Sequence, residues 1–479
     1  MVRSRGQALM HVEALFVTAA LVALFAALGY GIVYELLDTT PLQRLLLAPV
    51  TGLCAVTVPV ATLNHIGFPV GAVGRPVLWL ALLAAAVYYA LRRPSVPWRE
   101  ARPFLVVVAF AFVVAAWPMA VFNFDWVSFG NDDMTTYLLG GNHFFAHGYF
   151  QLPSASELMS ERDPSWNWSF FYSFTEVRYA APLMLAWIMS VTGLSSGAAF
   201  MPMIVALHVI VIASTGGLLA ARGDHGRAAL VACVLLAVSA NLLSGTLRQL
   251  LPQDFGLALL AAAVAALLRP PPAKRGSMVK RAVLGSLFVG TLVITYPEVL
   301  PFLGVPSAAY VALSVLRART SWRAWAILGA AVVLGAVIIA NENIPGEISL
   351  FAKQAHMATA AGSAYERGLF AAFLTPLVFP LFWGVATVGS AIGPLSVLAV
   401  VCCAFATLGA GAAALRYSLA LEPAALILLT MLALFVQLLV SGSSFGVFKL
   451  TMYVQPFLLG TIACCVADVA RRRAWRGAA

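Results

Sequence analysis

The 479-residue sequence has few charged residues and few cysteines, and both shortages exclude classes of protein. Only 10% of the residues are charged, against roughly 25% in soluble domains, so an ordinary soluble protein is excluded. The six cysteines all lie in apolar segments without C-x-x-C or Cys/His spacing, so neither a disulfide framework nor a structural zinc site is expected. The sequence also lacks Walker and Rossmann phosphate-binding patterns and the internal repeat of an inverted-repeat transporter.

The sequence is instead rich in long apolar segments. Hydrophobic residues make up 62% of the chain, and the mean hydropathy is +0.92. Apolar runs of roughly 17–24 residues can cross a hydrocarbon core of about 30 Å. We therefore predict an all-α, polytopic membrane protein with about thirteen transmembrane helices. The expected spans are 12–34, 45–63, 72–91, 103–121, 198–221, 227–244, 255–269, 281–296, 299–316, 324–340, 391–414, 423–440 and 448–470.

Two further apolar segments, 180–192 and 370–387, are short or interrupted by proline. We expect both to lie at the membrane interface as amphipathic segments. The first apolar segment has no clean signal-peptidase site, so we expect it to be retained as a span.

The net charge of +10 indicates membrane orientation and not nucleic-acid binding. Four basic clusters fall on one side of the expected topology, which the positive-inside rule makes cytoplasmic. Arg3 and Arg5 fall on the other side, against the rule. The clusters are Arg92, Arg93, Arg99 and Arg102; Arg269, Lys274, Arg275, Lys280 and Arg281; Arg317, Arg319 and Arg323; and Arg471, Arg472, Arg473 and Arg476.

The longest polar stretch, 122–179, follows the fourth span and is expected outside. It holds seven of the nineteen carboxylates and two of the seven histidines. Its many aromatic residues argue against disorder, so we predict a folded acidic cap. The expected division of the chain is N-terminal transmembrane helices over 1–121, an external catalytic-type loop with an interfacial helix over 122–197, a central bundle over 198–340, a second external segment over 341–390, and C-terminal helices over 391–479.

Asp132 and Asp133 are the candidate catalytic residues. A carboxylate can accept a proton as a general base, or it can ligate a divalent cation such as Mg²⁺ or Mn²⁺, which would then be a cofactor. Neighbouring residues on a helix point roughly 100° apart, so only one of the pair need face a site. The alternative is a helix N-cap cluster without catalytic function.

Other side chains near this pair, or near outer span ends, are candidates for substrate binding. His143 and His147 share one face of a helix, but packing or hydrogen bonding is favoured over metal binding, and no metal ligand is assigned. Ionisable groups at membrane depth usually have a partner or a function; for Lys449 the alternative is snorkelling. We expect Asp254 to converge with the outer charged groups above the bundle. The candidates are Tyr137, His143, His147, Arg178, Arg248, Glu298 and Lys449.

These features resemble the GT-C superfamily of integral-membrane glycosyltransferases. The resemblance covers most of the chain in layout and rests on four stretches, Asp132–Tyr137, Ala181–Ser195, Thr295–Glu298 and Phe445–Lys449. It implies an inverting transfer of sugar from a polyprenyl-phosphate-linked donor to an extracytoplasmic glycan, lipid or protein. The active site would lie on the external face of a plasma membrane (bacterial-type inner membrane), and Asp133 or Asp132 would be the base.

Two alternative functions differ in the residues that they need. A polymerase or ligase of lipid-linked polysaccharide would use Arg and His more than Asp. A non-enzymatic transporter or flippase of lipid-linked sugars would need charges inside the spans. The sequence shows few charges in the middle of spans and a large one-sided cap, which favours the enzyme. The expected partners are the lipid-linked donor, the acceptor and membrane lipids, with no nucleic acid.

Overall fold

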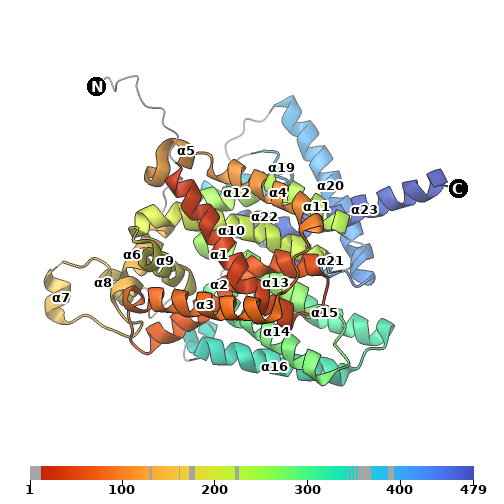
Figure 1. The fold of residues 1–479 in the computed structure, drawn as a ribbon. Helices are drawn as coiled ribbons and strands as arrows, with labels where there is room; N and C mark the ends of the chain where they lie inside the picture. Colours follow the sequence, from red (N-terminus) through yellow and green to blue (C-terminus); the bar gives the residue numbers. More distant parts are fainter. Residues whose placement is uncertain are drawn as a thin grey trace.

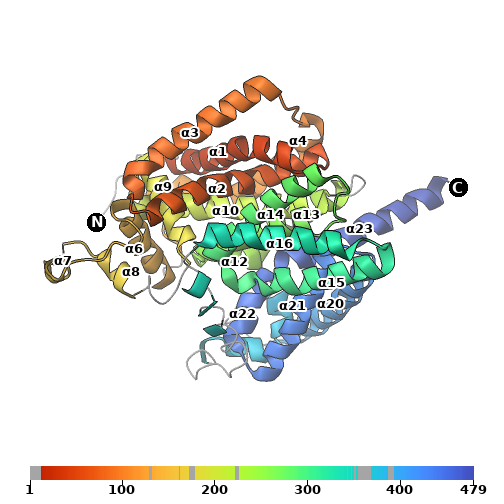
Figure 2. The same cartoon turned by 90° about the horizontal axis from the view of Figure 1, so that it is seen from below.

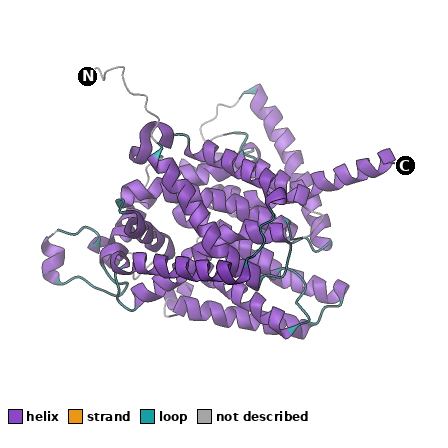
Figure 3. Cartoon of the chain, viewed as in Figure 1, coloured by secondary structure: helices purple, strands orange, loops and turns teal. Residues whose placement is uncertain are grey.

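The computed structural model describes residues 12–128, 132–160, 162–171, 178–221, 226–341, 344–346, 348–349, 352–353, 368–386 and 393–478. Within these residues the chain forms helices and no strand (Figure 3), which confirms the all-α prediction.

Helices lie before the predicted cap in the sequence, within it and after it. The elements of the first half are α1 (Glu13–Leu36), α2 (Pro41–His65), α3 (Val70–Arg92), α4 (Trp98–Ala116), α5 (Met119–Phe122), η1 (Asn123–Asp125), α6 (Asp132–Ala146), α7 (Ala155–Ser160), α8 (Trp166–Phe171), α9 (Ala180–Thr192), α10 (Ser196–Leu219), α11 (Gly226–Ala237) and α12 (Ala240–Leu247). Those of the second half are α13 (Leu251–Leu267), α14 (Arg275–Thr295), η3 (Pro297–Val299), α15 (Pro301–Ala318), α16 (Trp322–Ala340), η5 (Ala371–Leu374), α19 (Val378–Phe382), α20 (Pro394–Leu419), α21 (Pro423–Ser441), α22 (Ser444–Tyr453) and α23 (Gln455–Ala478).

The described part of the chain contains nine helices long and apolar enough to cross a membrane, or up to 12 when each of three bent helix pairs counts as one span. This composition identifies an integral membrane protein. The predicted span 255–269 corresponds to α13, which has 17 residues and is shorter than the others. The total of thirteen spans therefore stays a prediction.

The three bent pairs have identifiable local causes. Helices α4 and α5 meet at 57° beside Pro118, and α22 and α23 meet at 49° beside Pro456. A proline has no backbone N–H and clashes with the preceding turn, so helices bend there. Between α11 and α12, at 54°, Ser239 accepts a hydrogen bond from the Leu242 backbone N–H at 3.3 Å and so starts a new helix.

Helix α10 forms the centre of the bundle, and its residues are buried along nearly the whole length. It packs against α1, α2, α4, α9, α11, α13 and α23 (Figures 1 and 2). Helices α1 and α2 approach closely where Gly29 faces the Ala48 carbonyl and Gly52 faces the Phe25 carbonyl. Small residues permit this approach between transmembrane helices, where dispersion contacts drive association.

The outer helices present apolar side chains to the surroundings. Trp79 and Leu83 on α3, Leu334 on α16 and Phe405 on α20 are all exposed. In a bilayer these faces would contact lipid, which is as apolar as the side chains themselves.

The basic connectors lie together at one end of the bundle. The Arg269 Nη2 donates to the Asp38 carbonyl at 2.8 Å, and Glu35 lies 3.5 Å from Arg92 and 3.4 Å from Lys280. Helices α6 and α8 lie at the opposite end (Figure 2). The predicted gathering of basic connectors on one side is thus confirmed for these residues. That this side is cytoplasmic stays a prediction.

Helix α9 differs from its predicted environment. Its residues from Ala180 to Ser190 are all buried, because α2, α3, α6, α10, α13 and α14 surround it. An amphipathic helix at a membrane interface would expose one polar face. The prediction of a separate short helix over 180–192 is confirmed, and the prediction that it is amphipathic is wrong. Its position at the membrane interface stays a prediction.

Candidate functional site

The candidate site begins at the N-terminus of α6. Asp132 and Asp133 are the first residues of this helix, where the helix dipole favours negative charge. Further along, a Cβ on Gly140 would press on the Trp168 indole and on Pro182, and a Cβ on Gly141 would press on Leu185. The two glycines therefore let α6 lie directly on α9 and fix where its first turn sits.

A cluster of polar and aromatic side chains forms beside that first turn. The Arg178 Nη2 makes an ion pair with Glu298, and the exposed fractions of the two side chains are 17% and 10%. The Arg178 guanidinium also lies 5.6 Å from the centre of the Tyr296 ring and hydrogen-bonds Tyr137. The Tyr296 hydroxyl hydrogen-bonds the Tyr453 hydroxyl. We call these residues, together with Asp133, the Arg178 cluster.

Asp133 is the exposed carboxylate of the Arg178 cluster. Burial raises the pKa of the Tyr137 phenol, the charges of Asp133 and Glu298 raise it further, and Arg178 opposes them. The phenol therefore stays neutral and can donate a hydrogen bond near neutral pH. The side chain of Asp132 lies outside the described residues, so the geometry bears on Asp133 alone.

Glu298 reaches the cluster because α14 ends just before it. Tyr296 precedes Pro297 and has an extended φ of −156°, as residues before proline do. The chain then turns through η3, which carries Glu298. Its Oε2 is buried and accepts no hydrogen bond from the described residues, so its ion pair with Arg178 is the main compensation for burial that these residues provide.

Two cations, Arg248 at the end of α12 and Lys449 on α22, lie against phenyl rings of helix α22. The Arg248 guanidinium lies 5.1 Å from the centre of the Phe448 ring, and its Nε donates to Ser244 Oγ at 3.3 Å. The Lys449 Nζ lies 5.0 Å from the centre of the Phe445 ring. Lys449 and Tyr453 are four residues apart on α22, so their Cβ atoms are separated by about 6 Å. This one helical turn connects the two cations to the Arg178 cluster.

Asp254 does not join these groups, so its predicted convergence with them above the bundle is wrong. The side chain is fully buried in α13, and Thr246 Oγ1 donates to its Oδ2 at 2.7 Å. The same hydroxyl lies 2.8 Å from Nδ1 of His208. A hydroxyl has one proton, so with an ionised Asp254 accepting that proton the His208 Nδ1 would be the donor in that contact. The three side chains form a polar relay inside the bundle.

The two histidines of α6 belong to the aromatic cap. His147 Nε2 lies 2.9 Å from Asp163 Oδ2, and its ring stacks on Trp166 with centroids 3.9 Å apart. His143 is fully buried and stacks on Trp168 with centroids 5.4 Å apart. Burial and then the charge of His147 lower the pKa of His143 to about 4. His143 is therefore a neutral packing residue near neutral pH.

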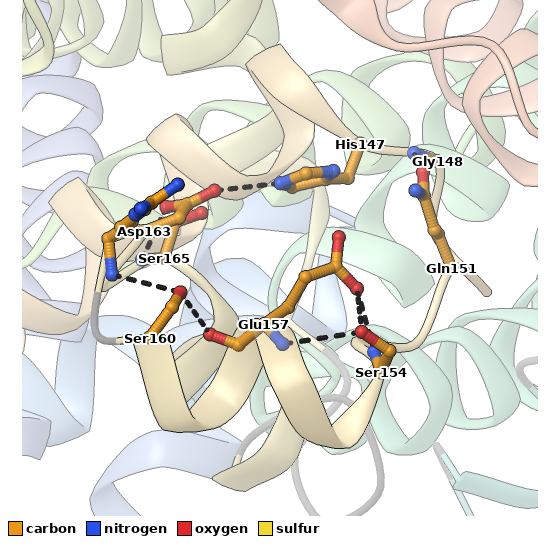
Figure 4. A network of polar contacts seen from close by, with 9 residues as sticks. His147, Gly148, Gln151, Ser154, Glu157, Ser160, Asp163 and Ser165 are labelled. Atoms are coloured by element: carbon orange, nitrogen blue, oxygen red, sulfur yellow. Dashed lines mark hydrogen bonds and ion pairs between the residues drawn. The ribbon is translucent and has the colours of Figure 1, made fainter.

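The loop after α6 is held to the cap by the His147–Asp163 contact (Figure 4). Glu157 Oε2 accepts from the Ser154 backbone N–H at 2.8 Å, and Ser154 Oγ accepts from the Glu157 N–H at 3.3 Å. This reciprocal pair is a capping box at the start of α7. Glu157 thus has a local structural function.

The described residues contain no group of three His, Cys, Asp or Glu side chains that could hold a metal ion. In the Arg178 cluster Glu298 is already paired with Arg178, which leaves Asp133 as the one described carboxylate available to a cation. A divalent cofactor such as Mg²⁺ or Mn²⁺ therefore has little support from these side chains.

Sequence reasoning did not assign Tyr296 and Tyr453 to the site. The only sequence signals were the position of Tyr296 before Pro297 and the spacing of Tyr453 from Lys449. Scans against models of protein families, curated proteins and solved structures found no match to this chain.

Proposed function

We propose that the chain is an inverting integral-membrane glycosyltransferase that moves a sugar from a polyprenyl-phosphate donor to an extracytoplasmic acceptor. The observation that carries the proposal is the convergence at one end of the bundle. The exposed Asp133 carboxylate and the largely buried Arg178–Glu298 pair gather around Tyr453 of α22, and two cations, Arg248 and Lys449, lie against phenyl rings of the same helix.

The cations suit a departing phosphate. Arg248 can donate two parallel hydrogen bonds to phosphate oxygens, and Lys449 supplies a compact charge. Negative charge grows on the phosphate oxygen as its bond to the sugar breaks, so these contacts stabilise the transition state more than the bound donor. The phenyl rings of Phe445 and Phe448 beside the cations would keep part of this region dry.

Asp133 is the proposed general base. The acceptor hydroxyl would lose its proton to the Asp133 carboxylate as its oxygen forms a bond to the anomeric carbon. The bond from that carbon to the phosphate oxygen breaks on the opposite face, and the polyprenyl phosphate leaves with the bonding electrons. Arg178 and Tyr137 would hold the acceptor or sugar hydroxyls close to Asp133.

The test is the release of polyprenyl phosphate by the purified protein from a panel of polyprenyl-phosphate hexoses and pentoses, with and without candidate acceptors. Asp133→Asn keeps the shape of the side chain and removes its basicity, so turnover should fall by about 10²–10⁴-fold. Asp125→Asn, which changes another exposed carboxylate, is the matched control and should be neutral. Asp132→Asn tests whether Asp132, and not Asp133, is the general base. Wild-type turnover in both Asp132→Asn and Asp133→Asn would exclude a general base at this site.

A transporter or flippase of lipid-linked sugars is the second candidate, and the buried His208–Thr246–Asp254 relay favours it. Ionisable groups inside a membrane bundle commonly belong to transport pathways. Vesicles containing the protein and a fluorescent polyprenyl-phosphate sugar distinguish the two. Transbilayer movement of the donor that is lost in Asp254→Asn and kept in Asp133→Asn would favour transport. The polymerase or ligase alternative has less support, because His143 is buried and His147 is paired with Asp163.

A further inference from the structure

A cavity lies far from the Arg178 cluster, between the C-terminal part of α20 and helix α23. Its volume is about 280 Å³. The polar side chains in its wall are Arg416, Tyr417 and Asp468, and the apolar ones include Ala412, Ala413 and Val469. It is smaller than most pockets for whole ligands, which measure roughly 300–1,000 Å³, and suits a small polar group.

The charges around this cavity do not cancel. Asp468 Oδ2 accepts a hydrogen bond from the Tyr417 hydroxyl at 2.6 Å, and Asp468 Oδ1 pairs with Arg471 at 2.6 Å. Arg416 is exposed and lies 5.9 Å from the ring of its neighbour Tyr417. It makes no hydrogen bond or ion pair with other described side chains. The carboxylate is thus compensated by Arg471, and the charge of Arg416 leaves the cavity positive.

The position of the cavity indicates where its ligand comes from. It lies at the basic end of the bundle, where the Arg317 Nη1 donates to the Leu419 carbonyl at 2.8 Å. Leu408 and Leu415, exposed on α20, lie four residues before and three residues after Ala412, on the same helix face. The cavity therefore adjoins an apolar face that a bilayer would cover.

Helix α23 extends past the rest of the bundle beside the cavity (Figures 1 and 2). The sequence adds Arg472, Arg473 and Arg476 to this extension. Basic residues next to a transmembrane helix attract anionic lipids, each contributing about 1 kcal/mol near a charged surface. This end of α23 would raise the local concentration of anionic headgroups around the cavity.

We propose that the cavity binds the phosphate of an anionic phospholipid. The Arg416 guanidinium donates to the phosphate oxygens, and the acyl chains lie along Leu408 and Leu415 of α20. The inference is independent of the proposed glycosyl transfer, because no residue of the Arg178 cluster takes part.

The experiment uses the full-length protein, purified in a neutral detergent and mixed with phosphatidylglycerol or phosphatidylcholine, with bound lipid counted by native mass spectrometry. Arg416→Gln removes the charge. Ala412→Phe fills the cavity and keeps the charge. The matched control is Arg323→Gln, because Arg323 is also an exposed arginine, 5.9 Å from the ring of its neighbour Trp322, yet does not line this cavity.

We expect phosphatidylglycerol to bind the wild type and Arg323→Gln equally, and to bind Arg416→Gln and Ala412→Phe at least about tenfold more weakly, the loss expected for one charge-assisted hydrogen bond. Equal binding to Arg416→Gln and the wild type would overturn the proposal. So would equal binding of phosphatidylcholine. Displacement of the lipid by millimolar inorganic phosphate would assign the cavity to free phosphate instead.

Discussion

Arg281 and Arg317 at the basic end of the bundle bind backbone carbonyls, whereas Arg178 at the other end binds side chains. At the basic end Arg281 Nη1 donates to the carbonyls of Arg269 and Pro270 at 2.9 and 2.7 Å, and Arg317 donates to the carbonyl of Leu419. Leu419 is the last residue of α20, and Arg269 and Pro270 follow the end of α13. Carbonyls at and just after helix ends have no partner within the helix, and basic side chains commonly satisfy them. At the other end Arg178 contacts the side chains of Glu298, Tyr137 and Tyr296.

The comparison separates arginines that hold connectors in place from one that organises a site. A guanidinium bound to backbone carbonyls fixes the path of the chain. A guanidinium bound to side chains from two distant segments, α6 and residues 296–298, fixes the relative positions of chemical groups. The basic end contributes to the net charge of +10, and the positive-inside rule predicts that this end is cytoplasmic. The predictions that follow test whether the two ends differ in exposure, in catalysis and in stability.

The largest expected difference is in access from outside the cell. A cysteine at Ser156, exposed on α7 of the cap, should react with a membrane-impermeant maleimide in intact cells. A cysteine at Ser277, in the first turn of α14, should react only after permeabilisation. The chain with its native cysteines gives the background. Labelling of Ser277→Cys and not of Ser156→Cys in intact cells would reverse the topology and put the Arg178 cluster in the cytoplasm.

The next largest effect is expected for Lys449. Lys449→Met keeps the apolar stem and removes the charge, so donor turnover should fall by about 10²-fold while the melting temperature changes little. Arg248→Lys should be milder than Arg248→Ala, because it keeps the charge and loses only the planar fork. Turnover and thermal unfolding measured on the same preparations separate catalysis from folding. A Lys449→Met protein with wild-type turnover would make Lys449 an interfacial anchor only.

Substituting one arginine at each end of the bundle tests directly whether the two arginines have different functions. Arg281→Gln loses two charge-assisted hydrogen bonds to carbonyls, so the free energy of unfolding should fall by about 2–4 kcal/mol with unchanged turnover per folded molecule. Arg178→Lys keeps the charge beside Glu298 and loses the geometry, so turnover should fall at least about tenfold with a stability loss of only about 1 kcal/mol. Chemical unfolding in detergent and single-turnover rates measure the two quantities. The reverse pattern, with Arg178→Lys active but unstable, would make the Arg178 cluster a structural device.

Much of the helical layout could be predicted from the sequence, because length and apolar composition decide which segments can cross a bilayer. The environment of α9 could not, because composition does not say whether an apolar helix meets lipid, interface or protein. Its complete burial depends on contacts with six other helices. The bends also needed the structure, since Pro118 and Pro456 bend helices while Pro49 and Pro59 lie within α2.

The candidate site was partly predictable for a similar reason. Arg248, Glu298 and Lys449 stood out because charged residues near span ends are unusual. Tyr296 and Tyr453 are ordinary in a membrane sequence, and their contact joins segments far apart in the chain. The prediction placed Asp254 beside Arg248 because the two residues are close in the sequence. In the structure Gln249 has a positive φ of 63°, and a new helix begins after it. This change of direction points Asp254 into the bundle.

The most local expected effect is a pH dependence confined to the cap. Burial and His147 lower the pKa of His143 to about 4, below its value of about 6.5 in an unfolded chain. Between these values the unfolded cap binds a proton that the folded cap does not, so stability is lost as pH falls from about 6.5, by up to about 1.4 kcal/mol per pH unit. Asp163 affects the stability of the cap in a lower pH range. Burial raises the pKa of Asp163, but hydrogen bonds from His147 and Ser165 outweigh burial and lower this pKa, so the stabilisation by Asp163 is lost only at still lower pH.

Hydrogen exchange of residues 143–168 should therefore accelerate between pH 7 and pH 5 while that of α10 does not. His143→Leu should remove most of this acceleration and leave cap exchange at pH 7 slow. An equal acceleration in His143→Leu would assign the pH dependence to another group.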